Sequence, residues 1–317
     1  MNLRRRLLAG LVGVAASPAL AQGSPLIEAA AAGRLEQTRS LLKSGANVRE
    51  RDASGRTALL AATQRNHEAL ARLLIEAGAD VNAQDNHQDS AYLLAGARGY
   101  LGILRMTLAA GADLKSTNRY GGTALIPACH YGHVETVREL LATQIDLNHV
   151  NKLGWTALLE AVILGDGGAK HTEIVRLLLA AQADPHIADR EGVTALAHAR
   201  QRGFAQMASL LQEASYRPAM RRAEHMKRLA VQAGDQPYGA VVLKAGRIVG
   251  EAPSRVVSAR NDDAHAERQA LADARKRLSD LGGCELVSTS RPCSLCERAA
   301  REAGIRRMIY GENLADA

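Results

Sequence analysis

The tetrad Thr57-Ala58-Leu59-Leu60 decides the fold of the first two thirds of the chain, because it returns at nearly constant spacing. Its later copies are Ser90-Ala91-Tyr92-Leu93, Thr123-Ala124-Leu125-Ile126, Thr156-Ala157-Leu158-Leu159 and Thr194-Ala195-Leu196-Ala197. A second signal, Gly45-Ala46-Asn47-Val48, returns in phase with the tetrad from Gly78, Gly111, Gln144 and Gln182. Two signals locked together at a period of about 33 residues indicate a stack of small helical units.

Each unit contains the local signals of two short helices. The hydroxyl residue of the tetrad is expected to cap the first helix, and the apolar residues after it are expected to pack on the neighbouring unit. A glycine such as Gly45 permits the left-handed turn that ends the second helix. Gln144 and Gln182 replace that glycine, so the last two units are expected to be strained there or to turn differently.

This pattern resembles the ankyrin family, which implies an all-α solenoid in which each repeat is a turn followed by two antiparallel helices. The resemblance covers residues 24–215 in about six units, and it implies a role in binding a protein partner or in positioning a neighbouring domain. One interval is longer because residues 166–170 are inserted between two helices. This insertion is either a tolerated surface loop or a contact for a partner.

Composition agrees with two domains. The chain has 317 residues, of which 47% are hydrophobic and only 3% aromatic, a balance that favours small, closely packed helices. The net charge is +7, and residues 217–317 hold 18 Lys and Arg against 13 Asp and Glu. This bias suits an anionic substrate or is simply a solvated basic surface. Four cysteines are too few for a disulfide scaffold.

The N-terminus has the pattern of a cleavable export signal. Arg4, Arg5 and Arg6 precede the apolar run 7–16, and Ala19-Leu20-Ala21 forms a small-residue cleavage site. Residues 1–21 are therefore predicted to be a signal peptide, which resembles a twin-arginine or a general secretory signal. The prediction is an exported, periplasmic or secreted protein whose mature chain has no transmembrane segment.

After Ala214 the repeat pattern stops, and Tyr216-Arg217-Pro218 is expected to be a short linker. The remaining segments predict an α-β-β-α-β-α-β order, which is typical of an α/β sandwich. The expected helices are 219–232, 264–278 and 294–303, and the expected strands are 239–243, 248–250, 285–289 and 306–310.

Two short motifs begin the last two of these helices. His265-Ala266-Glu267 is followed by Pro292-Cys293-Ser294-Leu295-Cys296, which together offer one imidazole, two thiols and one free carboxylate. Three ligands of this kind leave one coordination position open for water, as a catalytic zinc site requires. The helix N-terminus is expected to lower the pKa of the two thiols, and Glu267 is expected to move a proton.

These motifs resemble the cytidine and deoxycytidylate deaminase superfamily, in its guanine deaminase and tRNA adenosine deaminase branch, over residues 219–312. The resemblance implies one zinc ion on His265, Cys293 and Cys296, and Glu267 as proton shuttle. It also implies a nucleobase or nucleoside substrate, an amino-purine or amino-pyrimidine, that touches the backbone amide of Ala266. Ser254 stands where the branch usually has a substrate-binding Asn.

Other departures concern the surroundings of the site. Arg291 stands where the branch usually has Glu, and the chain ends at Ala317, where relatives continue into a helix that covers the pocket. The resemblance also makes a homodimer possible, while nucleic acid is a possible partner that no motif indicates. Three alternatives stay open: a thiol-disulfide oxidoreductase, a structural zinc site that uses Cys284, and an ankyrin binding module whose deaminase-like domain binds zinc but is inactive.

Overall fold

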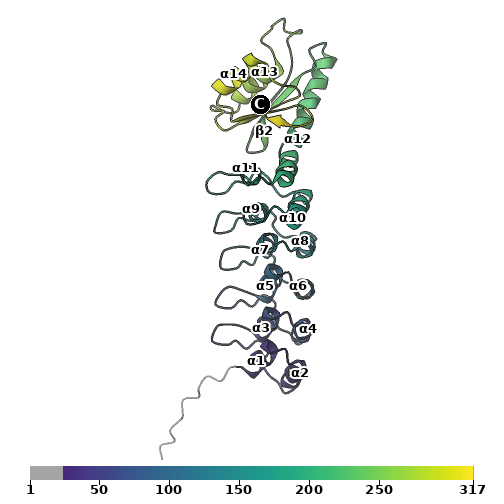
Figure 1. Ribbon diagram of the computed structural model, residues 1–317, viewed down its shortest axis with the longest axis vertical. Coiled ribbons are helices and arrows are strands. Elements are labelled where there is room, and N and C mark those ends of the chain that lie inside the picture. The colour runs from purple at the N-terminus through teal and green to yellow at the C-terminus, as the bar shows by residue number, and fades with distance from the viewer. Residues whose placement is uncertain (1–23, 317) are drawn as a thin grey trace, which may run out of the picture.

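The structure is a computed structural model that describes residues 24–316, and it shows an elongated helical stack that carries an α/β unit at its C-terminal end (Figure 1). The predicted signal peptide, residues 1–21, lies outside the described residues. Among residues 24–316, no helix combines the length and the apolar character that crossing a membrane requires.

Within residues 24–316, six helix pairs build the stack. The pairs are α1 (Pro25–Ala31) with α2 (Leu35–Lys43), α3 (Ala58–Gln64) with α4 (Glu68–Glu76), α5 (Ala91–Arg98) with α6 (Leu101–Ala109), α7 (Leu125–His130) with α8 (Val134–Leu141), α9 (Ala157–Ile163) with α10 (Ala169–Ala180), and α11 (Ala195–Gln201) with α12 (Ala205–Gln232). The first helices of successive pairs lie side by side, as do the second helices, so each repeat buries its apolar face on its neighbours (Figure 1).

Hydroxyl caps begin four of the five predicted first helices. The side chains of Thr57, Ser90, Thr156 and Thr194 each accept a hydrogen bond from the backbone N–H three residues later. Thr123 does not, because Ala124 is already helical in conformation and α7 begins one residue later than expected. The Thr123 hydroxyl is buried without a hydrogen-bond partner.

Where glutamine replaces the glycine at the end of the second helix, one position has the strained conformation and the other has a different turn. Gln182 adopts a φ of +68°, the left-handed conformation that glycine tolerates better than glutamine. Gln144 stays outside that region, because the hydroxyl of Thr143 donates to the carbonyl of Leu140 at 2.6 Å and the chain turns differently.

The predicted linker at residues 216–218 is wrong, because these residues lie inside α12, a single helix of 28 residues. Its first half completes the sixth repeat, and its second half packs against the sheet of the α/β unit. Tyr216 is buried, its hydroxyl donates to Glu285 at 2.9 Å, and Arg307 donates to that hydroxyl at 3.2 Å. The packing of α12 on the last repeat and on the sheet therefore outweighs the free-energy cost of Pro218, which removes a backbone hydrogen bond inside the helix.

The α/β unit contains a five-stranded sheet in the order β2-β1-β3-β4-β5. Only β3 and β4 are parallel; the other neighbours are antiparallel. The last strand is short and was not expected from the sequence. The elements are β1 (Gly239–Lys244), β2 (Arg247–Pro253), α13 (Ala266–Arg275), β3 (Glu285–Ser288), α14 (Ser294–Glu302), β4 (Arg307–Tyr310) and β5 (Ala315–Asp316).

Alternation along β1 separates the two faces of the sheet. Val241 and Leu243 join the core that α12 shares with the stack, while Ala240 and Val242 join a second core with α13 and α14. The α/β unit therefore has three layers, as predicted for an α/β sandwich.

The stack also touches the sheet through the turn between β1 and β2. The ring of His186, from the last repeat, lies so close to Gly246 that a Cβ on this glycine would be 2.3 Å from the ring. Gly246 has a φ of +76°, as a tight two-residue hairpin requires. At the other edge, Arg217 of α12 donates to the carbonyl of Glu312 at 3.1 Å.

Candidate active site

His265 and Glu267 stand at the start of α13. His265 is the residue before the first helical position, in extended conformation, and its side chain does not cap the helix. The imidazole is therefore free to reach beyond the helix end. Glu267 lies in the first turn of the same helix and is only 4% exposed.

Cys293 and Cys296 stand in the same way at the start of α14. Cys293 precedes the first helical residue and is exposed, whereas Cys296 lies in the first turn and is buried. Three residues along a helix start return both sulfur atoms to one side. The rigid ring of Pro292 and the preceding strand β3 fix the direction from which the chain enters this turn.

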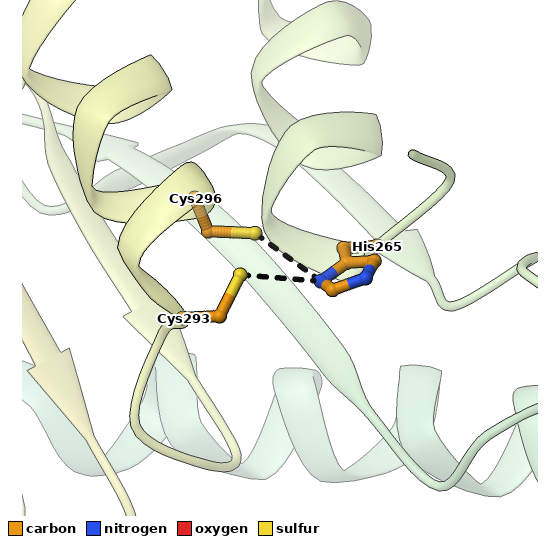
Figure 2. A group of neighbouring side chains, drawn as sticks. All are labelled: His265, Cys293 and Cys296. Atoms are coloured by element: carbon orange, nitrogen blue, oxygen red, sulfur yellow. Dashed lines mark hydrogen bonds between the residues drawn. The ribbon is translucent and has the colours of Figure 1, made fainter. Parts of the chain in front are cut away.

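The three predicted ligand residues converge although they come from two helices (Figure 2). Nδ1 of His265 lies 3.6 Å from Sγ of Cys293 and 3.4 Å from Sγ of Cys296. The three ligand atoms all lie within 4.8 Å of one another. Within residues 24–316 this is the one group of three or more His, Cys, Asp and Glu residues that could hold a metal ion.

This donor set fits zinc. One imidazole nitrogen and two thiols are the ligands that zinc prefers in proteins, and three protein ligands leave one tetrahedral position for water or substrate. Cys284 is buried and free, before β3, and does not join the group. A closed site with four protein ligands is therefore not formed by these residues.

Glu267 lies beside the group through one oxygen and is held through the other. Its Oε2 accepts a contact from Sγ of Cys296 at 3.6 Å, and its Oε1 accepts a hydrogen bond from the hydroxyl of Ser288 at 2.7 Å. Both Glu267 and Ser288 are buried, so this hydrogen bond is shielded from water. The carboxylate is thus fixed with one oxygen directed at the thiols.

Ser288 was not identified from the sequence. It ends the buried strand β3, five residues before Cys293, where the preceding Leu286 and Val287 are apolar and fully buried. A polar residue that ends an otherwise apolar strand next to the cysteine motif was the available signal. Its partner could not be read from spacing, since Glu267 is 21 residues away.

The expected lowering of the thiol pKa is not found for Cys296. Burial raises the pKa of this thiol, and the neighbouring Glu267 carboxylate and Cys293 raise it further. The N-terminus of a nine-residue helix does not overcome these effects. A zinc ion held by the group would favour the thiolate of Cys296, so that metal binding and deprotonation would be coupled.

The two predicted substrate contacts differ in how they are placed. Ala266 is the first residue of α13, so its backbone N–H has no partner within the helix. Ser254 follows β2 and is 1% exposed; its backbone N–H donates to the carbonyl of Tyr238 at 2.9 Å. Its hydroxyl is buried without a hydrogen-bond partner, and no described hydrogen bond joins it to Glu267.

Arg291 lies on the outside of the site. Its side chain is 71% exposed, and its Nε lies 3.9 Å from a carboxylate oxygen of Glu297 in the first turn of α14. An ion pair this exposed contributes little to stability. Arg291 is therefore available to a molecule that approaches the group from solvent.

Comparison with family models assigns both parts of the chain. A model described as ankyrin repeats in three copies matches residues 6–85 and 92–189. A model of the cytidine and deoxycytidylate deaminase zinc-binding region matches residues 213–312.

Curated relatives match the C-terminal part. The chain is similar to a tRNA-specific adenosine deaminase of Aquifex aeolicus, with 36% identity over 83 residues that cover 26% of this chain and 55% of that protein. It is similar to a guanine deaminase of Bacillus subtilis, with 34% identity over 83 residues that cover 26% of this chain and 53% of that protein. The chain thus spans about half the length of these two relatives.

A solved structure matches the stack. An ankyrin repeat domain of Acinetobacter baumannii is 58% identical, with a TM-score of 0.59, and the match covers 60% of this chain and 97% of that one.

Proposed function

The chain belongs to the ankyrin repeat family and carries a C-terminal cytidine and deoxycytidylate deaminase zinc-binding region, and on this premise we propose that it is a zinc-dependent hydrolytic deaminase. The proposed substrate is a nucleobase or nucleoside with an exocyclic amine. The observation that supports this most strongly is the convergence of His265, Cys293 and Cys296, with the buried carboxylate of Glu267 beside them.

The proposed ligands of one zinc ion are Nδ1 of His265 and the thiolates of Cys293 and Cys296. A zinc ion held there would lower the pKa of a water molecule from about 15.7 to about 7.

Glu267 is proposed to carry the proton. Its Oε2 would take a proton from the attacking water and give it to the leaving amine, while Ser288 holds Oε1 in place. In the whole reaction one water is consumed, the ring C–NH₂ bond is broken, a C=O bond is formed and ammonia leaves. The N–H of Ala266 and the unpartnered hydroxyl of Ser254 are the proposed substrate contacts.

The ankyrin stack is proposed to bind a protein and to position the catalytic unit. The continuous helix α12 supports the second role, because a helix packed on both sides transmits a fixed orientation where a flexible linker would not. The repeats could thereby hold the site against a partner or a larger substrate.

We also propose that the protein is exported. Cleavage after Ala21 would leave the first repeat intact, because α1 begins at Pro25 and its capping residue is Ser24. Export of a folded, metal-loaded chain would protect Cys293 and Cys296 from oxidation. Replacing Arg4 and Arg5 by Lys should then block export, and unaffected export would indicate the general secretory route.

Metal content and ammonia release test the enzymatic proposal. The purified full chain should contain one zinc ion and should release ammonia from at least one member of a panel of bases, nucleosides and tRNA. A Glu267→Gln chain measured in parallel provides the background. A chain that binds no zinc would overturn the proposal, and a zinc-loaded chain that is inactive on the whole panel would leave the binding-module function instead.

A further inference from the structure

A cavity of about 740 Å³ opens on the ankyrin stack, away from the α/β unit. It lies between the first helices of the third, fourth and fifth repeats, α5, α7 and α9, and the turns that precede α7 and α9. Nothing in the proposed deaminase chemistry uses this cavity.

The cavity wall contains a carboxylate with one oxygen that lacks a hydrogen-bond partner. Glu160 of α9 is 6% exposed, and its Oε2 is buried without a hydrogen bond. Its Oε1 receives only a long contact of 3.5 Å from the side-chain amide of Asn151. A buried carboxylate oxygen without a donor is costly, which marks a position that a ligand donor would stabilise.

In the sixth repeat, the equivalent two positions hold an acid and a base that form a pair. Asp189 and His198 occupy the positions that correspond to Asn151 and Glu160, and Nε2 of His198 lies 2.6 Å from Oδ2 of Asp189. In the fifth repeat the acidic residue, Glu160, lies on the helix, and the residue opposite, Asn151, is a neutral amide. The repeat therefore carries an acid without the base that pairs with it.

The neighbouring titratable groups do not neutralise Glu160. His130 of α7 has its Nδ1 3.9 Å from Oε2, but burial and the nearby charge of His171 lower the pKa of His130. Cys129 is fully buried, and burial together with Glu160 raises the pKa of its thiol, so it is uncharged. Burial raises the pKa of Glu160 itself to about 7. A cation that reached Oε2 would favour the ionised carboxylate.

The rim of the cavity is aromatic and apolar. The ring of Tyr131 is stacked on that of His130 with 4.2 Å between centroids, and Tyr131 is 59% exposed. Tyr120, Leu153 and Leu164 also line the cavity and are exposed. Faces of exposed tyrosine rings attract cations, and large exposed apolar side chains are typical of a binding surface.

Two arginines limit which cation fits. Arg119 lies over the ring of Tyr120 at 4.9 Å and 3.9 Å from a carboxylate oxygen of Asp89. The charge of Arg98 also lowers the pKa of Asp89, against the larger effect of burial, which raises it. These side chains occupy the Asp89 end of the cavity and would repel a strongly basic segment. The arrangement favours a single basic residue among apolar neighbours.

We propose, on the basis of the protein-binding role proposed for the stack, that this cavity binds one lysine or arginine side chain from a segment of a protein partner. The ammonium or guanidinium group donates to the carboxylate of Glu160. The aliphatic part of the side chain lies along Tyr131, and the apolar neighbours contact Leu153 and Leu164.

A random peptide library tests this proposal on the full chain at pH 8. Selection on the unaltered chain should enrich peptides with one Lys or Arg at a fixed position between apolar residues. Selection on Glu160→Gln should lose that preference, whereas Glu36→Gln, which removes an exposed carboxylate of α2, should keep it.

Calorimetry with one selected peptide then gives the size of the effect. Replacing the basic residue by Ala, or Glu160 by Gln, should each weaken binding at least about tenfold, and the two changes together should weaken it little further. Three outcomes would overturn the proposal. The selection could yield no peptide, it could yield peptides without a basic residue, or the Glu160→Gln chain could select the same peptides as the unaltered chain. Thermal unfolding of each variant confirms that the fold is kept.

Discussion

The hydroxyl of Ser288 donates a 2.7 Å hydrogen bond to Oε1 of Glu267, and this contact joins the end of a strand to the first turn of a helix. It fixes the carboxylate so that Oε2 faces Cys296. Ser288 therefore acts as a positioning residue for Glu267.

Ser288→Ala should lower kcat about 10- to 100-fold with little change in KM, because a hydrogen bond to a charged group contributes roughly 1.5–3 kcal/mol. Ser288→Thr, which keeps the hydroxyl, should restore part of the loss. Steady-state kinetics on a substrate found in the panel would check this, with zinc content as the control. An equal loss of kcat in both variants would point to a packing role only.

Glu267→Gln should keep the zinc and lower turnover at least about 100-fold, because the amide cannot accept and return a proton. Oε1 of the glutamine can still accept the hydrogen bond from Ser288, so the local structure should persist. Elemental analysis and ammonia release measure the two properties on the same sample. Turnover close to that of the unaltered chain would show that another group moves the proton.

Cys293→Ser and Cys296→Ser should each lose most of the bound zinc, because removal of a thiolate from a three-ligand set weakens binding severely. Cys284→Ser is the matched control, since this buried free cysteine lies outside the group, and its zinc content should be unchanged. Chelation of the unaltered chain should abolish activity, and added zinc should restore it. Unchanged zinc in Cys293→Ser would refute the assigned ligands.

Glu160→Gln should stabilise the chain above neutral pH and have little effect near pH 4.5. Burial raises the pKa of Glu160 from 4.5 to about 7 in the folded state, so the unfolded state releases this proton first. Stability therefore falls as pH rises from about 4.5 to about 7, and at pH 8 the loss is complete, on the order of 3 kcal/mol. Urea unfolding at pH 4.5 and pH 8 measures the difference, with Glu36→Gln as control. A difference between Glu160→Gln and the unaltered chain that does not change with pH would contradict the predicted pKa.

Gly246→Ala should destabilise the chain by roughly 1–3 kcal/mol, because the new Cβ meets the ring of His186 and the backbone has a φ of +76°. His186→Ala removes the ring, so the double variant should recover the part that is due to the clash. A coupling of about 1 kcal/mol in this cycle would measure the contact between the stack and the α/β unit. Strict additivity would mean that only the backbone conformation matters.

The features that the sequence predicted are those that short-range signals encode. Helix caps at Thr57 and Thr156 and the left-handed turn at Gln182 act within four or five residues, so the repeats and the starts of most of their first helices could be read directly. Cys293 and Cys296 share one helix start, so their common direction followed from spacing alone.

The features that the sequence did not predict depend on contacts between distant residues. The continuity of α12 through Pro218, the partnership of Ser288 with Glu267 and the unpartnered Oε2 of Glu160 all arise from burial by segments far away in the chain. The repeat architecture, the α/β layering and the identity of the expected zinc ligands could be read from local patterns of residues. Which polar groups are paired, and which are left without a donor, became visible in the folded chain alone. The reason is physical: whether a buried polar atom is satisfied depends on three-dimensional neighbours, which local spacing does not specify.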